Sequence, residues 1–465
     1  MTLDRDAGAL GAQIQDQVRA AVREGRLRAD ERLPSTRRLA ADLGVSRGTV
    51  VDAYEQLIAE GYLRSTVGSG TTAASGPGEA AASRSAPSIA PAPAVADFEY
   101  GIPDLRSVPL ADWRWALVEA IRRLRVADLG DGDPAGSMHL REVVAAYHRR
   151  VRAGAAVAAD TVVVAGFREG LSLAFAALKR HGIADVALED PGPYEHEALV
   201  RRAGLAAVPV PVDADGIDVA VLSRSGARAV LLTPAHQCPT GVVLTPSRRR
   251  RLIEWAEQVN GVVLEDDYDA EFRYDRQPVG SLQGLAPGRV IALGSVSKTL
   301  APALRLGWVL APRRFVADIA DEKRLRSRAA PAVDQEALAL LIETGRYDRH
   351  LRRMRDVYRR RRDALVDEVE RIFGPGGLQG SVAGCHTLLR LPAGASEQEV
   401  VTEAAAGGVR VHGLARYRFP AQADADRPSA PALVIGFGNV DEERIRRGIQ
   451  VIAAVVRRAG RADGR

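Results

Sequence analysis

The sequence predicts a multidomain protein, with a small, mainly helical domain first and a large α/β domain behind it. Three observations predict this fold class. The chain has 465 residues, more than one domain usually holds, and its 46% hydrophobic content suffices for a large core. A segment poor in large apolar side chains separates residues 1–72 from the rest. Strand and helix patterns alternate through residues 160–310, as in a mainly parallel sheet with helices on both faces.

Composition and charge narrow the class of protein. No apolar run reaches the roughly 18 residues of a membrane-spanning helix, and the first six residues are too charged to begin a signal peptide. Two cysteines, Cys238 and Cys385, fit a reducing cytosol without disulfides, so we expect a cytoplasmic protein and no membrane partner. The net charge is +5, but residues 1–72 hold ten basic and ten acidic residues. Bulk charge therefore does not argue for DNA binding here.

Residues 1–72 have the pattern of a helix-turn-helix domain. Apolar residues at helical spacing predict a first helix over residues 9–24. Ser35 is placed to cap a second helix, and Ser46 to cap a third, with a break at Leu43-Gly44 between them. The order of the three helices and the tight turn is the usual arrangement of a DNA-binding helix-turn-helix.

The end of this domain indicates how it would bind. Residues 61–72, with Gly68 and Gly70 at the tip, predict a two-stranded wing. The helix after Ser46 would lie in a major groove of a double-stranded DNA operator, with Arg47-Gly48-Thr49 facing bases and phosphates. A winged helix that contacts another protein is the alternative.

A linker follows the first domain. From Thr71 to about Ala96 the residues are mostly Ala, Pro, Ser and Gly, which cannot bury enough surface to offset the entropy of ordering. The expected boundaries are a DNA-binding domain at 1–72, a linker at 73–97 and a large domain at 98–460, with its main part at about 120–325 and a small carboxyl-terminal subdomain at about 340–460.

Lys298 lies in a stretch that predicts pyridoxal phosphate. The chain has only three lysines among its 64 lysines and arginines. Where an amine must lose its proton and attack an aldehyde, lysine is required, so Lys298 is expected to form a Schiff base. The hydroxyls of Ser295 and Ser297 and the guanidinium of Arg305 are groups that bind a phosphate. A solvated surface lysine is the alternative, since the motif is short.

A second stretch strengthens this prediction. Val262-Val263-Leu264 reads as a buried strand, and Glu265-Asp266-Asp267-Tyr268 lies at its carboxyl end, where open α/β sheets bind ligands. A pyridoxal ring needs a carboxylate against its nitrogen, and Asp266 is the expected one. Tyr268 would place its hydroxyl on the phenolate oxygen of the ring. An acidic turn after a strand is a common alternative for one stretch alone, but not for the pair.

Several runs in this sequence resemble the MocR-type regulators, a branch of the GntR family. These runs are LPSTRRLA and GVSRGTV near the amino terminus, then TPAHQCPTG, LEDDYDAEFRYD and GSVSKTLAPALRLGW. The likeness reaches from the first helix to about Val456. It implies a winged helix-turn-helix joined to a pyridoxal-phosphate-dependent domain of fold type I, with a small α+β subdomain. It also implies pyridoxal 5'-phosphate as cofactor and a homodimer, because such sites are built at a subunit boundary.

The resemblance also assigns roles to single residues. It implies DNA contacts at Arg37, Arg47, Thr49 and Gly68. The loop Gly166-Phe167-Arg168, which opens a helix, would present backbone N–H groups to the phosphate. Tyr194 would supply the ring that stacks on the cofactor, although Pro193 and Tyr194 are exchanged relative to the usual order.

Three positions depart from the family pattern. Asp131 stands where a tyrosine often reaches the phosphate of the partner subunit's cofactor, and Cys238 stands where aminotransferases have asparagine. We expect Cys238 to pack rather than react. The run Val434-Ile435-Gly436-Phe437 lies where such enzymes carry the arginine that holds the substrate carboxylate. Arg410 and Arg416 are the candidates to replace that arginine.

Two functions fit these motifs. The first is a transcription regulator in which pyridoxal phosphate, alone or joined to an amino acid or amine effector, sets DNA affinity. The second is a working aminotransferase with an appended helix-turn-helix, and the fold does not decide between them. The expectation is a sensor rather than an enzyme, because the carboxylate-binding arginine is missing. An empty aminotransferase fold is disfavoured, since Asp266, Tyr268, Lys298 and Arg305 are all present. No metal site is predicted.

Overall fold

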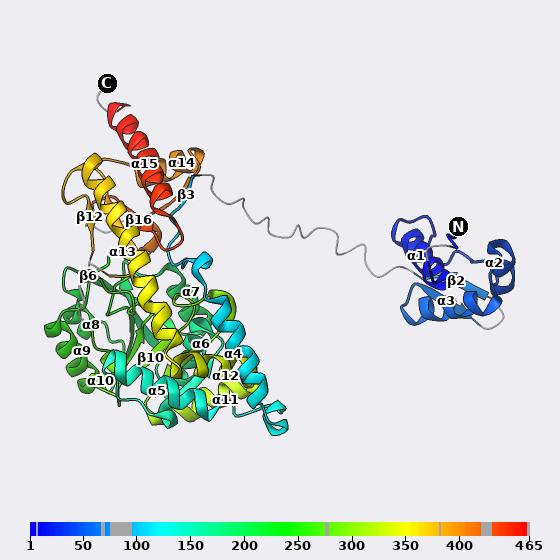
Figure 1. The fold of residues 1–465 in the computed structure, drawn as a ribbon, viewed down its shortest axis with the longest axis horizontal. Coiled ribbons are helices and arrows are strands. Elements are labelled where there is room, and N and C mark those ends of the chain that lie inside the picture. The colour runs from blue at the N-terminus through cyan, green and yellow to red at the C-terminus, as the bar shows by residue number, and fades with distance from the viewer. Residues whose placement is uncertain are drawn as a thin grey trace. The chain divides into compact units, whose positions relative to one another are not determined.

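The computed structural model describes residues 1–5, 8–66, 70–74, 95–274, 279–380, 383–419 and 430–462. The chain divides into two compact units, residues 1–91 and 92–465 (Figure 1). Within the described ranges, no helix combines the length and the hydrophobicity that crossing a membrane requires.

The first unit consists of three helices and a hairpin. These are α1 (Leu10–Arg23), α2 (Thr36–Leu43), α3 (Arg47–Ala59), β1 (Leu63–Thr66) and β2 (Gly70–Ala73), the two strands being antiparallel. Both expected caps are present: the Ser35 hydroxyl accepts from the Arg38 N–H at 3.3 Å, and the Ser46 hydroxyl accepts from the Thr49 N–H at 3.1 Å. Between them Gly44 ends α2 in the left-handed conformation, at φ 64°, which favours glycine.

A small core holds this unit together. Ile14, Val18, Val50 and Leu57 have no exposed surface, and they pack where the helical spacing predicts an inward face. The strand β2 continues to Ala73, and Ala74 is also buried. The folded unit therefore reaches two residues beyond the expected boundary at residue 72.

An eight-stranded sheet forms the centre of the second unit. Its strands are β4 (Thr161–Val164), β5 (Asp185–Asp190), β6 (Ala206–Asp213), β7 (Gly216–Ile217), β8 (Ala229–Leu232), β9 (Val262–Asp266), β10 (Val290–Ser295) and β11 (Gly307–Leu310). Their order is β4-β11-β10-β9-β8-β5-β6-β7. The neighbours from β10 to β6 are parallel, and β11 and β7 run antiparallel. The sheet is mainly parallel, as the sequence predicted.

Helices cover both faces of this sheet. They are α4 (Leu110–Arg123), α5 (Met138–Arg152), α6 (Phe167–Arg180), α7 (Tyr194–Arg202), α8 (Val219–Arg224), α9 (Pro246–Gln258), α10 (Leu282–Leu285), α11 (Arg313–Arg326) and α12 (Ala332–Glu343). Successive side chains of a strand point to opposite faces of the sheet and pack in different hydrophobic cores. Ala292 of β10 packs with residues of α4, α5 and α12, whereas Ile291 and Leu293 pack with residues of α6 and α11. Continuous apolar strands are explained by this burial on both sides.

The helix α13 (Arg346–Phe373), yellow in Figure 1, leads from the large sheet to a smaller subdomain. Its first half packs in the large core and its second half in the smaller one. The smaller subdomain contains β12 (Leu378–Gln379), β13 (His386–Arg390), α14 (Glu397–Ala406), β14 (Val409–Arg410), β15 (His412–Gly413), β16 (Ala432–Gly436) and α15 (Glu442–Ala462). Its antiparallel sheet has the order β12-β13-β16-β15.

The chain enters this unit through the smaller subdomain. The strand β3 (Ala96–Asp97) pairs in parallel with β14, and Phe98 is fully buried in the smaller core. Ordered pairing therefore starts two residues before the expected start at residue 98. The segment that follows the linker in sequence is thus held by strands more than 300 residues further along the chain, as the pairing of Asp97 with Arg410 shows.

Candidate functional site

Lys298 lies just after β10 and borders a cavity. The side-chain amine donates a hydrogen bond to the Gly101 carbonyl. The cavity is lined by Tyr100, Gly101, Ile102, Pro103, Tyr268, Asp269, Lys298, Cys385 and His386. Burial lowers the pKa of Lys298, against the opposing pull of nearby acidic groups. A lowered pKa makes more of the neutral amine available near neutral pH, which is the form that attacks a carbonyl.

Asp266 is the last residue of β9, next to β10 in the sheet. The parallel register sets Asp266 opposite Leu293, so both strand ends bring their following residues to the same edge. The Asp266 side chain is buried, and its Oδ1 atom has no hydrogen-bond partner among the residues the structure describes. Burial, with Asp267 and Asp269 nearby, raises the pKa of Asp266 well above its ordinary value. An unpaired buried carboxylate oxygen fits a protonated ring nitrogen, which would supply the missing donor.

His196 contacts this carboxylate and was not found from the sequence. Its Nε2 atom lies 3.8 Å from Asp266 Oδ2, and its side chain is buried. Burial lowers the pKa of His196 to about 3, so the ring is neutral at neutral pH. The Phe167 ring lies beside it, with ring centroids 5.9 Å apart. The helical pattern of Tyr194–Arg202 is the only sequence signal, because it turns residues 196 and 200 inward together.

Tyr194 is placed differently from His196. It is 41% exposed at the start of α7 and is not among the lining residues of the Lys298 cavity. Its ring meets Tyr417 edge-on at 5.9 Å, and the Arg416 guanidinium lies 4.1 Å from its centroid. These contacts belong to a cavity separate from that of Lys298, which Pro193 and His196 also line. Stacking of Tyr194 on a cofactor therefore stays a prediction.

The groups expected at the phosphate meet at the start of α6. Gly166 precedes this helix with φ 86°, and a Cβ there would lie 3.4 Å from the Arg305 guanidinium. Arg305 donates to the Ala165 carbonyl at 2.8 Å and is otherwise exposed. The N–H groups of Phe167 and Arg168 belong to the first turn of the helix, which favours an anion. Arg305 and this helix start thus come together although they are distant in sequence.

The remaining residues of the predicted phosphate site are partly engaged within the protein. The Ser295 hydroxyl accepts from the Ser297 N–H at 3.3 Å. The Arg168 side chain forms an ion pair with Glu195, so only its backbone is available for a phosphate. Tyr268 was expected at the phenolate oxygen of the ring rather than at the phosphate, and its hydroxyl donates to the His236 carbonyl at 2.8 Å.

Cys238 and Asp131, two of the residues that depart from the family pattern, have partners within the protein. Cys238 is fully buried and packs with Leu388 and Val434, as expected for a packing residue. Burial raises the pKa of its thiol well above the ordinary value, which disfavours the reactive thiolate. Asp131 forms an ion pair with Arg328.

The two arginines considered as replacements for the missing carboxylate-binding arginine already have acidic partners. Arg410 lies 3.1 Å from Asp97, and Arg416 lies 3.7 Å from Glu99. Both pairs are partly buried, so a ligand carboxylate would have to compete with them.

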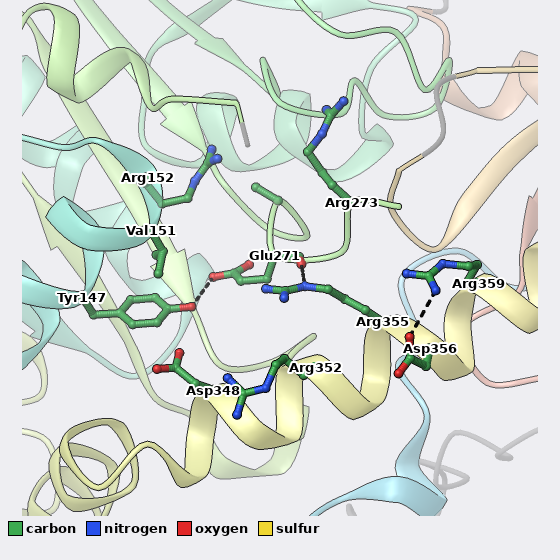
Figure 2. A pocket seen from close by; sticks show the side chains of 11 residues that line it. Tyr147, Val151, Arg152, Glu271, Arg273, Asp348, Arg352, Arg355, Asp356 and Arg359 are labelled. Atoms are coloured by element: carbon green, nitrogen blue, oxygen red, sulfur yellow. Dashed lines mark hydrogen bonds and ion pairs between the residues drawn. The ribbon is translucent and has the colours of Figure 1, made fainter. Parts of the chain in front are cut away.

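A larger cavity of about 460 Å³ lies beside Arg152, the last residue of α5. Three arginines of α13 line this cavity, and Figure 2 shows them on one stretch of the helix: Arg352, Arg355 and Arg359. Arg355 donates to the Glu271 carbonyl at 2.7 Å, and burial raises the pKa of Glu271 to about 7. No predicted site residue lines this cavity.

The predicted DNA-binding residues lie on the first unit. Arg37 and Arg47 are exposed, and neither forms an ion pair with any residue in the described ranges. Thr49 is tied to the cap of α3, with its hydroxyl 2.8 Å from the Ser46 hydroxyl. Gly68 lies outside the described residues. Arg47 and Thr49 thus stand in the first turn of α3, where a recognition helix contacts DNA.

The role of Asp266 can be tested by replacing it with asparagine. Asp266→Asn keeps the shape but removes the charge that would pair with a protonated ring nitrogen, so we expect pyridoxal phosphate to bind about 10- to 150-fold more weakly. Absorbance titration of cofactor-free protein measures this. Asp267→Asn is the matched control, because Asp267 lies in the same turn but pairs with Arg152 at 2.7 Å. Equal losses in both variants would contradict a specific role for Asp266.

Comparisons with known proteins agree with this division of the chain. Residues 10–72 match the family described as bacterial regulatory proteins, gntR family, and residues 104–402 match aminotransferase class I and II. A probable rhizopine catabolism regulatory protein, MocR, from Rhizobium meliloti is 32% identical over 97% of this chain and 94% of its own. The pyridoxine biosynthesis transcriptional regulator PdxR of Corynebacterium glutamicum is 32% identical over 93% of both chains.

A solved structure matches the second unit. An archaeal alanine:glyoxylate aminotransferase superposes with a TM-score of 0.70, covering 78% of this chain and 91% of its own. Its sequence is 22% identical, so the likeness concerns the fold.

Proposed function

Since this chain belongs to the MocR-type transcriptional regulators, which join a GntR helix-turn-helix to an aminotransferase class I and II domain, we propose that its second domain senses pyridoxal phosphate. In this proposal the cofactor is bound through a Schiff base with Lys298. The bound cofactor, alone or together with an amino acid or amine effector, sets the affinity of residues 1–72 for an operator. A regulator of transcription works where the DNA lies, so the proposal also places the protein in the cytoplasm.

The observation that carries the proposal is the placement of Asp266 and Lys298 at the ends of two neighbouring parallel strands, on one edge of the sheet. The amine has a lowered pKa, and the carboxylate has a buried oxygen that no described residue satisfies. When bound, pyridoxal phosphate supplies an aldehyde for the amine and a ring that accepts electrons. Lys298 holds the reactive amine, Asp266 accepts the hydrogen of the ring nitrogen, and Arg305 with the start of α6 binds the phosphate. The Oδ1 atom of Asp266 would thereby receive the partner that it lacks among the described residues.

We also propose that the protein is a homodimer. Two helix-turn-helix domains would then reach two half-sites of one operator, which is the usual geometry for this class of DNA-binding motif. The exposed side chains of Arg37 and Arg47 support a role in DNA contact, because neither is used within the described part of the first unit.

A second candidate function is transamination. It is favoured by the presence of Lys298, Asp266, Tyr268 and Arg305 together. Against it stands the buried Val434 at the position of the carboxylate-binding arginine, with Arg410 and Arg416 already paired to acids. Without a bidentate partner, an amino acid loses binding energy and the alignment that its reaction needs. We therefore expect slow turnover or none.

The test is to mix cofactor-loaded protein with a panel of amino acids and amines and with a keto acid. Product formation and operator affinity are followed together. We expect at least one amine to change operator affinity, with product limited to about one equivalent per chain. Lys298→Ala is the control, because it keeps the DNA-binding domain and should not respond. Rapid multiple turnover with unchanged operator affinity would make the enzyme the better description.

A further inference from the structure

Three buried side chains from different parts of the second unit meet near the Lys298 cavity. His236 lies in the turn after β8, Asp269 in the turn after β9, and His386 begins β13 of the smaller subdomain. They are 1%, 4% and 2% exposed. Each offers one ligand atom such that all three atoms lie within 4.8 Å of one another. Among the described residues, no other group of three such donors gathers this closely.

The two imidazoles have unused nitrogens. His236 Nε2 and His386 Nε2 are both buried, and neither has a hydrogen-bond partner in the described part of the chain. Burying a polar atom without a hydrogen-bond partner is unfavourable, so two such atoms in neighbouring rings require an explanation. The two rings are close neighbours, with the centroids of His236 and His386 4.4 Å apart.

The backbone around the cluster is also fitted to it. Asp269 Oδ2 lies 2.9 Å from His236 Nδ1 and holds that ring in place. The backbone of Gly384, with φ 68°, packs directly against these two side chains. A Cβ atom at this position would lie 2.1 Å from His236 Nδ1 and 2.4 Å from Asp269 Oδ2. Any side chain there would therefore clash with the His236 ring and the Asp269 carboxylate. Glycine allows the backbone to pass this close to the two side chains.

We propose that His236, Asp269 and His386 bind one divalent transition-metal ion of the zinc type. Two neutral imidazoles and one carboxylate are the donor set that zinc and similar ions prefer, whereas calcium and magnesium prefer oxygen alone. Ligand atoms around a tetrahedral zinc ion lie about 3.3 Å apart, so the cluster closes onto the ion through small side-chain rotations. The ion would give a partner to His386 Nε2, which has none among the described residues.

The site borders the cavity of Lys298. Asp269 and His386 line that cavity, and three protein ligands leave one position of a tetrahedral ion open. In the sheet register, His386 pairs with Gly436, two residues from Val434. A cation there would stand near the place where the carboxylate-binding arginine is missing. Metal binding itself does not depend on the proposed sensing of pyridoxal phosphate.

The experiment uses the full chain without an added histidine tag, dialysed against a chelator. Calorimetric titration with zinc chloride measures affinity and stoichiometry, and cobalt(II) absorbance reports the coordination geometry. We expect one ion per chain and intense visible cobalt bands from a tetrahedral site. In His236→Gln and His386→Gln, the affinity should fall by at least about 100-fold.

His148→Gln is the matched control, because His148 is also 4% exposed and has unpartnered ring nitrogens, yet it belongs to no such cluster. Retained binding in this variant, with loss in the other two, supports the site. No binding by the unaltered chain, weak octahedral cobalt bands, or unchanged affinity in His386→Gln would each overturn it. The cobalt spectrum of the unaltered chain keeps the test valid if a variant fails to fold. Because these readouts need no pyridoxal phosphate, their failure is separate from that of the proposed function.

Discussion

Replacing Lys298 with alanine should abolish the adduct that borohydride traps between the protein and pyridoxal phosphate. Only an amine that has attacked the aldehyde gives a reducible bond, and the pKa of Lys298 is lowered by burial in the cavity it lines. The loss should be complete, because no other side chain supplies that amine at this place. Mass spectrometry of the reduced protein measures the bound cofactor and its position.

The other two lysines provide the controls. Lys179 is exposed and donates to the Ala203 carbonyl at 3.2 Å, and Lys323 is buried with its amine donating to the Arg328 carbonyl. Lys179→Ala should keep the full adduct. An adduct that persisted on either residue in the Lys298→Ala protein would show that the assignment of Lys298 is wrong.

Arg47→Ala should weaken operator binding by about 1–3 kcal/mol, or roughly 5- to 150-fold, if the guanidinium makes a bidentate base contact. Arg47 opens α3, the helix that would enter the groove, and no described residue forms an ion pair with it. Affinity is measured on the operator and on random DNA at one fixed salt concentration, because phosphate contacts depend strongly on salt.

A matched variant separates the base contact from general charge. Arg26 is exposed and pairs with Glu24 at 2.6 Å, in the turn after α1. Arg26→Ala removes the same charge from the same unit, and we expect little change in operator affinity. An equal loss of binding to operator and to random DNA in Arg47→Ala would instead identify Arg47 as a phosphate contact.

The parts of this protein that the sequence predicted correctly depend on local signals. Ser35, Gly44 and Ser46 determine the ends of α2 and α3 through bonds to neighbouring residues, so their spacing was sufficient. The burial of β9 on both faces was visible as the continuous apolar run Val262-Val263-Leu264. On each side of the expected linker two more residues pair, because the N–H groups of Ala74 and Ala96 donate to the carbonyls of Tyr62 and Gly408.

The candidate site shows the same contrast. Asp266 and Lys298 were predicted because each follows a strand of the same parallel sheet, and parallel strands end at one edge. His196 was missed, since its link to Asp266 passes through the packing of α7 and leaves no spacing signal. Tyr194 was chosen in the same segment, but the helix turns it towards Arg416 and Tyr417.

The sequence alone therefore determined the order of the domains and the helix-turn-helix, and it predicted a site with Lys298 and Asp266 at the sheet edge. The tertiary structure decided which side chains from separate segments share a buried volume. His236 and His386 come from the two subdomains, and only the closure of β13 against the turn after β8 brings their rings to 4.4 Å. Such a contact depends on how the large sheet and the smaller subdomain pack together. The spacing of residues along the sequence does not predict that packing.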